Sequence, residues 1–505
     1  MRWGQSPFIA MRDSSHRKNG DCPLFLFYII FIAFLALAGC IQGPDYRRPN
    51  VQTPANWDGI TRGERHAEVR IAEGQTPEAR WWRAFQNEEL TNLIETALTS
   101  NHDVRRASAR VLEARAVSRQ AYAGLLPQVT LDPSYTRRRI SENVKFAPQG
   151  GGIANFAPPG SEFDLFSVPL DLSWEVDLWG KTRRALESAE AEWQASDHDR
   201  RAVTLTLISE VGQAYFLLRA LDEQIEIAEK TLALRQDSLA IVRSRFQAGL
   251  ASDLDVSRAE AEAADTAAII PDLRRQRAQT VHRLAVLLGE NPGERTFPAR
   301  SLRMVIAQPE IPVGLPSQLL ERRPDILNAE QLLVSANAQI GEAKAFFFPQ
   351  LTITGSGGLQ SSDFANWFKA GSRIYSLGPS LSLPIFEGGR NLARLEGARA
   401  RYEQAIERYR QTILQAFREV ADALVAIQMR TEQRDRQRER VASAKRALEL
   451  ANIRYREGLV TYLDVIDSQR TVLAAETALV ETESLRLADL VTIFKALGGG
   501  WEKDA

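Results

Sequence analysis

Hydrophobic and polar residues along this chain follow one series of periods that occurs twice. In the first copy a segment of helical period, 88–125, ends at a proline, and a segment of strict alternation follows it. Every second residue of that segment is apolar: Val168, Leu170, Leu172, Trp174, Val176 and Leu178. The residues between them are mostly polar, which predicts a strand with one wholly apolar face. The second copy has its helical segment at 316–347 and an equivalent alternating segment around 377–385.

A glycine ends the strand region of each copy, and the period after it becomes helical. No proline occurs in 181–247 after Gly180, or in 390–456 after Gly389. At about 1.5 Å per residue each helix would be roughly 100 Å long, which is more than a globular domain needs. Such helices coil with partners or bridge a gap. Each is followed by a Gly-Leu turn and a return helix, predicted at 252–288 and 461–497.

A constant offset shows that the two copies are a duplication. The turn at Gly249 lies 209 positions before the turn at Gly458, and Gly289 precedes Gly498 by the same interval. Upstream of the strands the offset is 222, and the extra residues fall in a Gly- and Pro-rich stretch that is predicted to be a surface loop. The predicted organisation is repeat 1 at 88–298 with strands at about 127–178, a linker at 299–315, repeat 2 at 316–498 with strands at about 349–387, and a tail at 499–505.

The N-terminus predicts export and lipidation. Basic residues precede an apolar run, 24–38, which is too short for an ordinary membrane-spanning helix. The run ends at Leu-Ala-Gly-Cys, which resembles the bacterial lipobox, so 1–39 is predicted to be a lipoprotein signal peptide and Cys40 the lipidated residue. An uncleaved membrane anchor is the alternative. The segment 40–87 would be a lipidated N-terminal extension, and either Met1 or Met11 is the start.

Composition excludes several classes of function. The formal net charge of −1 gives no basic footprint for nucleic acid. Five histidines show no metal-ligand spacing, and the chain has no Gly-rich phosphate loop with a following Lys-Ser/Thr pair. The sequence therefore predicts no enzyme, no metal and no cofactor.

Four amphipathic strands per chain are too few to close a barrel, because small closed barrels need about eight. Open sheet edges do not persist in lipid, so strands from several chains must join, and cyclic symmetry is the simple solution. Trp174 and Trp179 lie on or beside the apolar face, where anchoring at a membrane interface and ordinary packing both account for them.

The chain resembles the TolC family of outer-membrane efflux proteins, in its lipidated OprM/NodT-type branch. The matching motifs are Leu-Ala-Gly-Cys at 37–40, Gly-Pro-Asp-Tyr-Arg-Arg-Pro at 43–49, Trp-Trp-Arg-Ala-Phe at 81–85, Leu-Pro-Ser at 315–317, Leu-Glu-Arg-Arg-Pro-Asp at 320–325, both Gly-Leu turns and Ala-Leu-Gly-Gly-Gly-Trp at 496–501. The resemblance implies a mainly α fold with a β-barrel: a trimeric, twelve-stranded barrel in the outer membrane, continued by a long helical barrel in the periplasm. Ile41 after the lipidated cysteine is similar to the family's outer-membrane sorting pattern.

The family also implies a passive exit duct for small molecules such as drugs or toxic compounds. Its partners would be a periplasmic membrane-fusion adaptor and an inner-membrane pump of the RND type. The docking turns that the resemblance implies are Arg245, Gly249, Leu250 and Ser252 in the first copy and Arg454, Gly458, Leu459 and Thr461 in the second. Two other functions stay open, an outer-membrane duct for type I protein secretion and a lipid-anchored coiled-coil scaffold.

Two carboxylates match family positions that ring the closed inner end of the tunnel, Asp464 and Asp467. A spacing of three places them on one helix face, and a ring of carboxylates favours cations. Thr461 and Asp464 also have capping-box spacing, so a role as a helix cap is the alternative for Asp464. Asp467 is the favoured gate residue, with Arg258 at the equivalent position of the first copy as its suggested partner.

Overall fold

The computed structural model describes residues 41–54, 57, 71–73, 78–143, 160–304 and 309–499. They fall into two compact units. Of the described residues, 41–43, 125–143, 160–183 and 341–391 form the strand unit, and the others form the helical unit. The predicted signal peptide, Cys40 and residues 500–505 lie outside the described residues.

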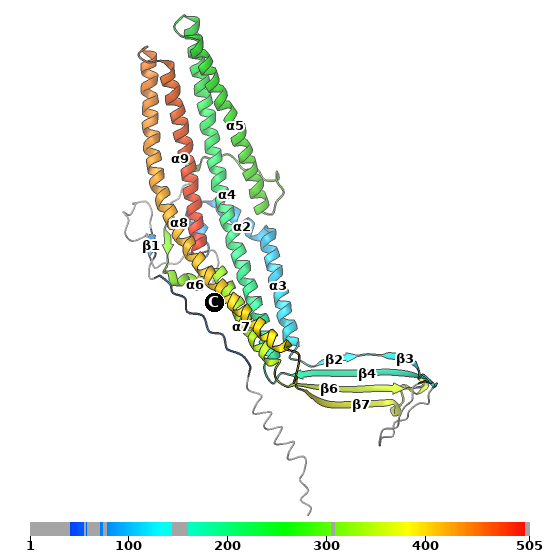
Figure 1. Cartoon of the computed structure of the whole chain (residues 1–505). Coiled ribbons are helices and arrows are strands. Elements are labelled where there is room, and N and C mark those ends of the chain that lie inside the picture. Colours follow the sequence, from blue (N-terminus) through cyan, green and yellow to red (C-terminus); the bar gives the residue numbers. More distant parts are fainter. Residues whose placement is uncertain are drawn as a thin grey trace, which may run out of the picture. The chain divides into compact units, whose positions relative to one another are not determined.

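The strand unit is one antiparallel sheet in the order β2-β4-β6-β7, with β3 also paired to β4 (Figure 1). Its strands are β2 (Gln128–Leu131), β3 (Ser134–Arg139), β4 (Glu162–Val176), β6 (Gln350–Ser361) and β7 (Arg373–Ser382). The sequence predicts two strands in each copy, whereas the first copy has three. Asp132 and Pro133 separate β2 from β3, and these two strands pair with successive stretches of β4. Proline has no N–H to donate to a ladder, so the strand is broken there.

The strand register assigns each side chain to one face of the sheet. Phe166 lies opposite Tyr135 on β3, Leu170 lies opposite Gly357 on β6, and Gly357 lies opposite Tyr375 on β7. One face is therefore apolar over most of the sheet: Val129, Leu131, Tyr135, Phe166, Val168, Leu170, Leu172, Trp174, Val176, Leu351, Ile353, Leu359, Tyr375, Leu377, Pro379 and Leu381. The other face is mainly Ser, Thr, Gln and carboxylates. We call these the apolar face and the polar face.

The long helices of the two copies have equal lengths. Helices α4 (Lys181–Gln247) and α8 (Arg390–Arg456) have 67 residues each, and the return helices α5 (Asp253–Leu287) and α9 (Tyr462–Ala496) have 35 each. The 67-residue helices are thus about 100 Å long. The remaining elements are α2 (Glu88–Ser100), α3 (His102–Ala123), α6 (Leu319–Arg322), α7 (Pro324–Ala345), the short parallel strands β1 (Ile71–Glu73) and β5 (Ile311–Val313), and five short 3-10 turns.

The segment predicted as a single helix at 88–125 is two helices that meet at Asn101. The Asn101 side chain accepts hydrogen bonds from the first N–H groups of α3 and donates to the Leu287 carbonyl, 2.9 Å away. At the equivalent place in the second copy, Arg323 donates to the Ala496 carbonyl, 3.0 Å away. In each copy the residue just before α3 or α7 therefore bonds to the end of the return helix. This residue is an asparagine in the first copy and an arginine in the second.

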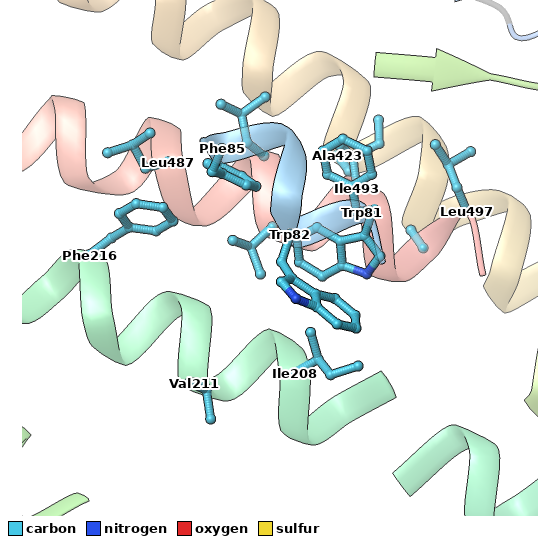
Figure 2. Close-up of a cluster of buried hydrophobic side chains, with 14 of the residues drawn as sticks. Trp81, Trp82, Phe85, Ile208, Val211, Phe216, Ala423, Leu487, Ile493 and Leu497 are labelled. Atoms are coloured by element: carbon cyan, nitrogen blue, oxygen red, sulfur yellow. The ribbon is translucent and has the colours of Figure 1, made fainter. Parts of the chain in front are cut away.

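Aromatic residues of the 3-10 turn η1 (Trp81–Phe85) fill the core of the helical unit. Figure 2 shows Trp81, Trp82 and Phe85 between α4, α8 and α9. Trp81 stacks on Phe494 with ring centroids 4.9 Å apart, and both tryptophans are at most 3% exposed. Trp81 and Trp82 therefore pack against the long helices. Among the described residues, no helix combines the length and the hydropathy needed to cross a bilayer.

Candidate docking tips and barrel wall

The two Gly-Leu turns have the same geometry. Gly249 and Gly458 have φ values of 74° and 72°, the left-handed region that ends helices without strain only at glycine. The next N–H, of Leu250 or Leu459, donates to the carbonyl of Arg245 or Arg454 at 2.8 and 2.9 Å.

Leu250 and Leu459 are the exposed apolar groups of the tips, each with 68% of its surface accessible. The two equivalent loops therefore present the same exposed apolar side chain. The structure places the predicted docking residues at the turns of two helical hairpins, α4–α5 and α8–α9, and the two turns have the same conformation.

A reciprocal cap begins each return helix. The Asp464 carboxylate accepts from the Thr461 N–H at 3.0 Å and from the Thr461 hydroxyl at 2.7 Å. Asp255 makes the same two contacts with Ser252, at 3.2 and 2.8 Å. The hydrogen bond from the Thr461 hydroxyl lowers the pKa of Asp464. Asp464 and Asp255 therefore stabilise the first turns of α9 and α5, as the capping-box spacing suggests.

Asp467 lies one turn further along α9 and is exposed. Its carboxylate forms no ion pair within the described chain. Arg258 is 4.0 Å from Asp255 on its own helix and makes no contact with Asp467. The pairing of Arg258 with Asp467 that the sequence suggests does not form within the described chain.

A small core joins the two hairpins just behind the tips. Its buried members come from α4, α5 and α9: Val242, Val256, Ala259, Tyr462, Val465 and Ile466. Tyr455 of α8 lies 5.4 Å from Tyr462, ring centroid to ring centroid, and the Arg245 guanidinium lies over the Tyr455 ring at 5.0 Å. Burial raises the pKa of Tyr462 to about 12. Arg245 thus links the two hairpins, a role that the sequence gives no sign of.

An ion cluster lies deeper between the hairpins. Arg235 of α4 and Glu262 of α5 are 4% and 5% exposed at the side chain and 3.0 Å apart. Arg470 of α9 also donates to Glu262. Arg235 further donates to the Thr266 hydroxyl at 2.6 Å, and burial lowers the pKa of Arg235. No repeated pattern in the sequence reveals this cluster, because it exists in one copy only: the residues equivalent to Arg235 and Glu262 are Ala444 and Thr471.

A groove of about 920 Å³ runs beside the cluster, between α4 and the α8–α9 hairpin. Ile227, Leu234 and Leu448 contribute apolar surface, and Lys230 and Glu476 are among its charged residues. Among the described residues, no group of three His, Cys, Asp or Glu could hold a metal ion.

The N-terminal segment is held at the base of the sheet. The Gln42 N–H donates to the Trp179 carbonyl at 3.0 Å, and the Trp179 indole N–H donates to the Pro349 carbonyl at 2.7 Å. Trp179 also stacks on Phe348 with centroids 4.9 Å apart. Trp179 therefore packs against the two residues that precede β6.

Comparisons with known proteins agree with this architecture. The chain matches the family model described as outer membrane efflux protein over residues 93–290 and 315–499. The pyoverdine export outer membrane protein OpmQ of Pseudomonas aeruginosa is 35% identical over 478 residues, which cover 94% of this chain and 96% of that protein. The cation efflux system protein CusC of Escherichia coli is 33% identical over 476 residues, or 94% and 98% of the two chains.

Solved structures with this fold are outer-membrane channels. The outer-membrane channel OprN superposes with a TM-score of 0.82 at 33% identity, covering 92% of this chain and 100% of that one. The CmeC outer membrane channel of Campylobacter jejuni superposes with a TM-score of 0.80 at 26% identity, covering 92% of this chain and 96% of that one.

The chain belongs to the outer membrane efflux protein family. The predictions of a TolC-like fold and of an outer-membrane efflux duct are confirmed. The family consists of channel proteins rather than enzymes.

Proposed function

We propose that three copies of this chain form a passive exit duct, which is lipid-anchored at Cys40 and extends from the outer membrane into the periplasm. The observation that supports the trimer most directly is the open sheet. Its edges are β2–β3 and β7, and in lipid such edges must be paired. Three sheets joined edge to edge give twelve strands, counting β2 and β3 as one.

The length of the apolar face supports the placement in a membrane. On β4 it extends from Phe166 to Val176, ten residue steps or about 33 Å along the strand. A strand tilt of about 40° reduces this to about 25 Å, which is the height of the lipid-facing band in outer-membrane barrels. Aromatic side chains, Phe166 and Trp174, stand near both ends of this stretch, as interfacial anchors do.

The helix tips are the proposed contact with a periplasmic adaptor and, through it, with an inner-membrane pump of the RND type. Leu250 and Leu459 would enter the adaptor interface, and Arg245 and Arg454 would hold the turns. The relatives are named for cations in one case and for pyoverdine in another, at similar identity. We therefore assign the choice of cargo to the pump rather than to the duct.

Conductance tests the duct. Purified mature protein should run as a trimer and should open cation-selective channels in planar bilayers. A monomer without conductance contradicts the proposal.

Docking is tested with the tagged chain expressed in its own cells. The wild-type chain should co-purify with one adaptor and one pump, and Leu250→Asp with Leu459→Asp should lose both. Leu112→Asp on α3, of similar exposure (66%), is the control. Loss of both partners by this control as well would contradict a docking role for the tips, provided that all variants remain trimeric.

The gate is tested at Asp467. Three Asp467 carboxylates near the axis would attract cations, so Asp467→Ala should lower cation selectivity and raise conductance. Asp422→Ala, which removes an exposed carboxylate of α8, should change neither. Unchanged selectivity in the Asp467 variant contradicts the gate assignment.

A further inference from the structure

The alternation along β4 changes phase beyond Phe166. From Val176 to Phe166 every second residue of β4 is apolar, and these residues form the apolar face. The next two residues on that face are Asp164 and Glu162. Opposite them on β3 lie Arg137 and Arg139, on the same face as Tyr135. Arg138, between the two arginines, belongs to the polar face. The face that is apolar along most of the sheet therefore ends in charged residues at the end farthest from the helix connections.

The two arginines are held as a pair. Glu162 lies 3.0 Å from Arg137 and 3.7 Å from Arg139, so one carboxylate is shared by two guanidinium groups. Arg139 also pairs with Glu142 at 3.2 Å, and the Tyr135 hydroxyl donates to Asp164 at 2.9 Å. The arginine side chains stay 65% and 62% exposed. Because each guanidinium has five N–H donors, these contacts orient the arginines and leave donors for a ligand.

An aromatic cluster lies next to the charged end. Phe166 contacts Tyr135 with centroids 4.9 Å apart, and Phe364 and Trp367 of the β6–β7 connection at 5.5 Å each. Phe364 and Phe368 remain 63% and 73% exposed. Aromatic side chains of this kind lie at the level of lipid headgroups in membrane proteins. In the proposed barrel the arginine pair would therefore lie at the level of the lipid headgroups.

We propose that Arg137 and Arg139 bind the phosphate groups of a phosphorylated glycolipid in the outer leaflet. The inference rests on the proposed barrel, with this end of the sheet facing outward. Arg373 begins β7 on the same face, so the charged end has three arginines against the carboxylates of Glu162 and Asp164. Trimer closure would bring the β7 edge of one copy, with Arg373, against the β2–β3 edge of the next. Guanidinium groups bind phosphate through two parallel hydrogen bonds, which a fixed pair on a rigid strand favours.

The experiment uses the full-length trimer in zwitterionic detergent, with bisphosphorylated lipid A as the probe. Dephosphorylated lipid A and inorganic phosphate are the two comparison ligands. The test variant combines Arg137→Gln with Arg139→Gln, and the matched control is Arg138→Gln, on the opposite face of the same strand. Binding is followed by native mass spectrometry and by the shift in apparent Tm.

Bisphosphorylated lipid A should bind the wild type and the Arg138 variant equally and raise the Tm of both. Binding to the double variant should be weaker by about tenfold for each arginine removed, because a charge-assisted hydrogen bond contributes that much. Equal binding by the double variant, equal loss in the Arg138 control, equal binding of dephosphorylated lipid A, or the same shift with inorganic phosphate alone would each overturn the proposal.

Conductance of the same preparations separates the two proposals. A wild type without pores contradicts the duct, whereas normal pores in all variants with no dependence on lipid phosphate contradict only the lipid site.

Discussion

Replacing Glu262 by alanine should loosen the tips far more than replacing a neighbouring glutamate. The substitution leaves Arg235 with its side chain 4% exposed and without its carboxylate partner. Removing one partner of a buried ion pair costs about 3–5 kcal/mol, because the remaining charge keeps its desolvation penalty. Arg470, with its side chain 57% exposed, can turn to water and adds little to this cost.

Glu260 provides the control, two residues away on the same helix. It pairs with Arg243 at 2.7 Å, but both side chains are at least half exposed. An exposed pair contributes about 0.2–1 kcal/mol. The loss of stability caused by Glu262→Ala should therefore exceed the loss caused by Glu260→Ala by at least about 2 kcal/mol.

Hydrogen exchange of the trimer measures this difference locally. A loss of about 3–5 kcal/mol raises the exchange of α5 amides that open with the tip by roughly 150- to 5000-fold, whereas Glu260→Ala raises it less than about sixfold. Replacing Arg235 and Glu262 together by methionine should restore most of the protection, because no unpaired charge is left. Equal exchange in the Glu262 and Glu260 variants would refute the reasoning.

Further predictions concern the turns, the core and the cap. Gly458→Ala should destabilise the second tip by about 1–2 kcal/mol, because its φ of 72° is strained for a residue with a Cβ. Gly397→Ala, inside α8, where a new Cβ would meet only the Arg401 side chain at an ordinary contact distance of 3.8 Å, should stabilise the protein by up to about 1 kcal/mol. Chemical denaturation of the two variants distinguishes the two signs. Trp81→Ala should cost about 3–5 kcal/mol and lower the apparent Tm of the trimer; an unchanged Tm would mean that the stack on Phe494 is dispensable. The lowered pKa of Asp464 means that its cap is complete above the ordinary value of 3.8 and is lost as the pH falls through the lower folded value. Exchange in the first turn of α9, corrected for intrinsic rates, should therefore rise in acid, and Asp464→Asn should remove that pH dependence.

Periodicity in the sequence determined the long helices and the strand faces. The change of period after Gly180 and Gly389 is local, and α4 and α8 begin at the next residue in both copies. The Gly-Leu turns and the capping pairs could also be found, because each depends on residues within about six positions of one another. Duplication made these signals stronger, since every local pattern occurs twice.

Only the tertiary structure decided which distant side chains meet. Arg235, Glu262 and Arg470 lie on three helices, and no spacing in the sequence relates them. The pairing of β2 and β3 with successive stretches of β4 is a tertiary feature. The charged residues beyond Phe166 form a cluster only because the strand register places Arg137 and Arg139 beside Glu162. Local periods follow from the geometry of a single helix or strand. Ion pairs and strand partners depend on packing between segments far apart in the chain, which one sequence does not encode in any fixed interval.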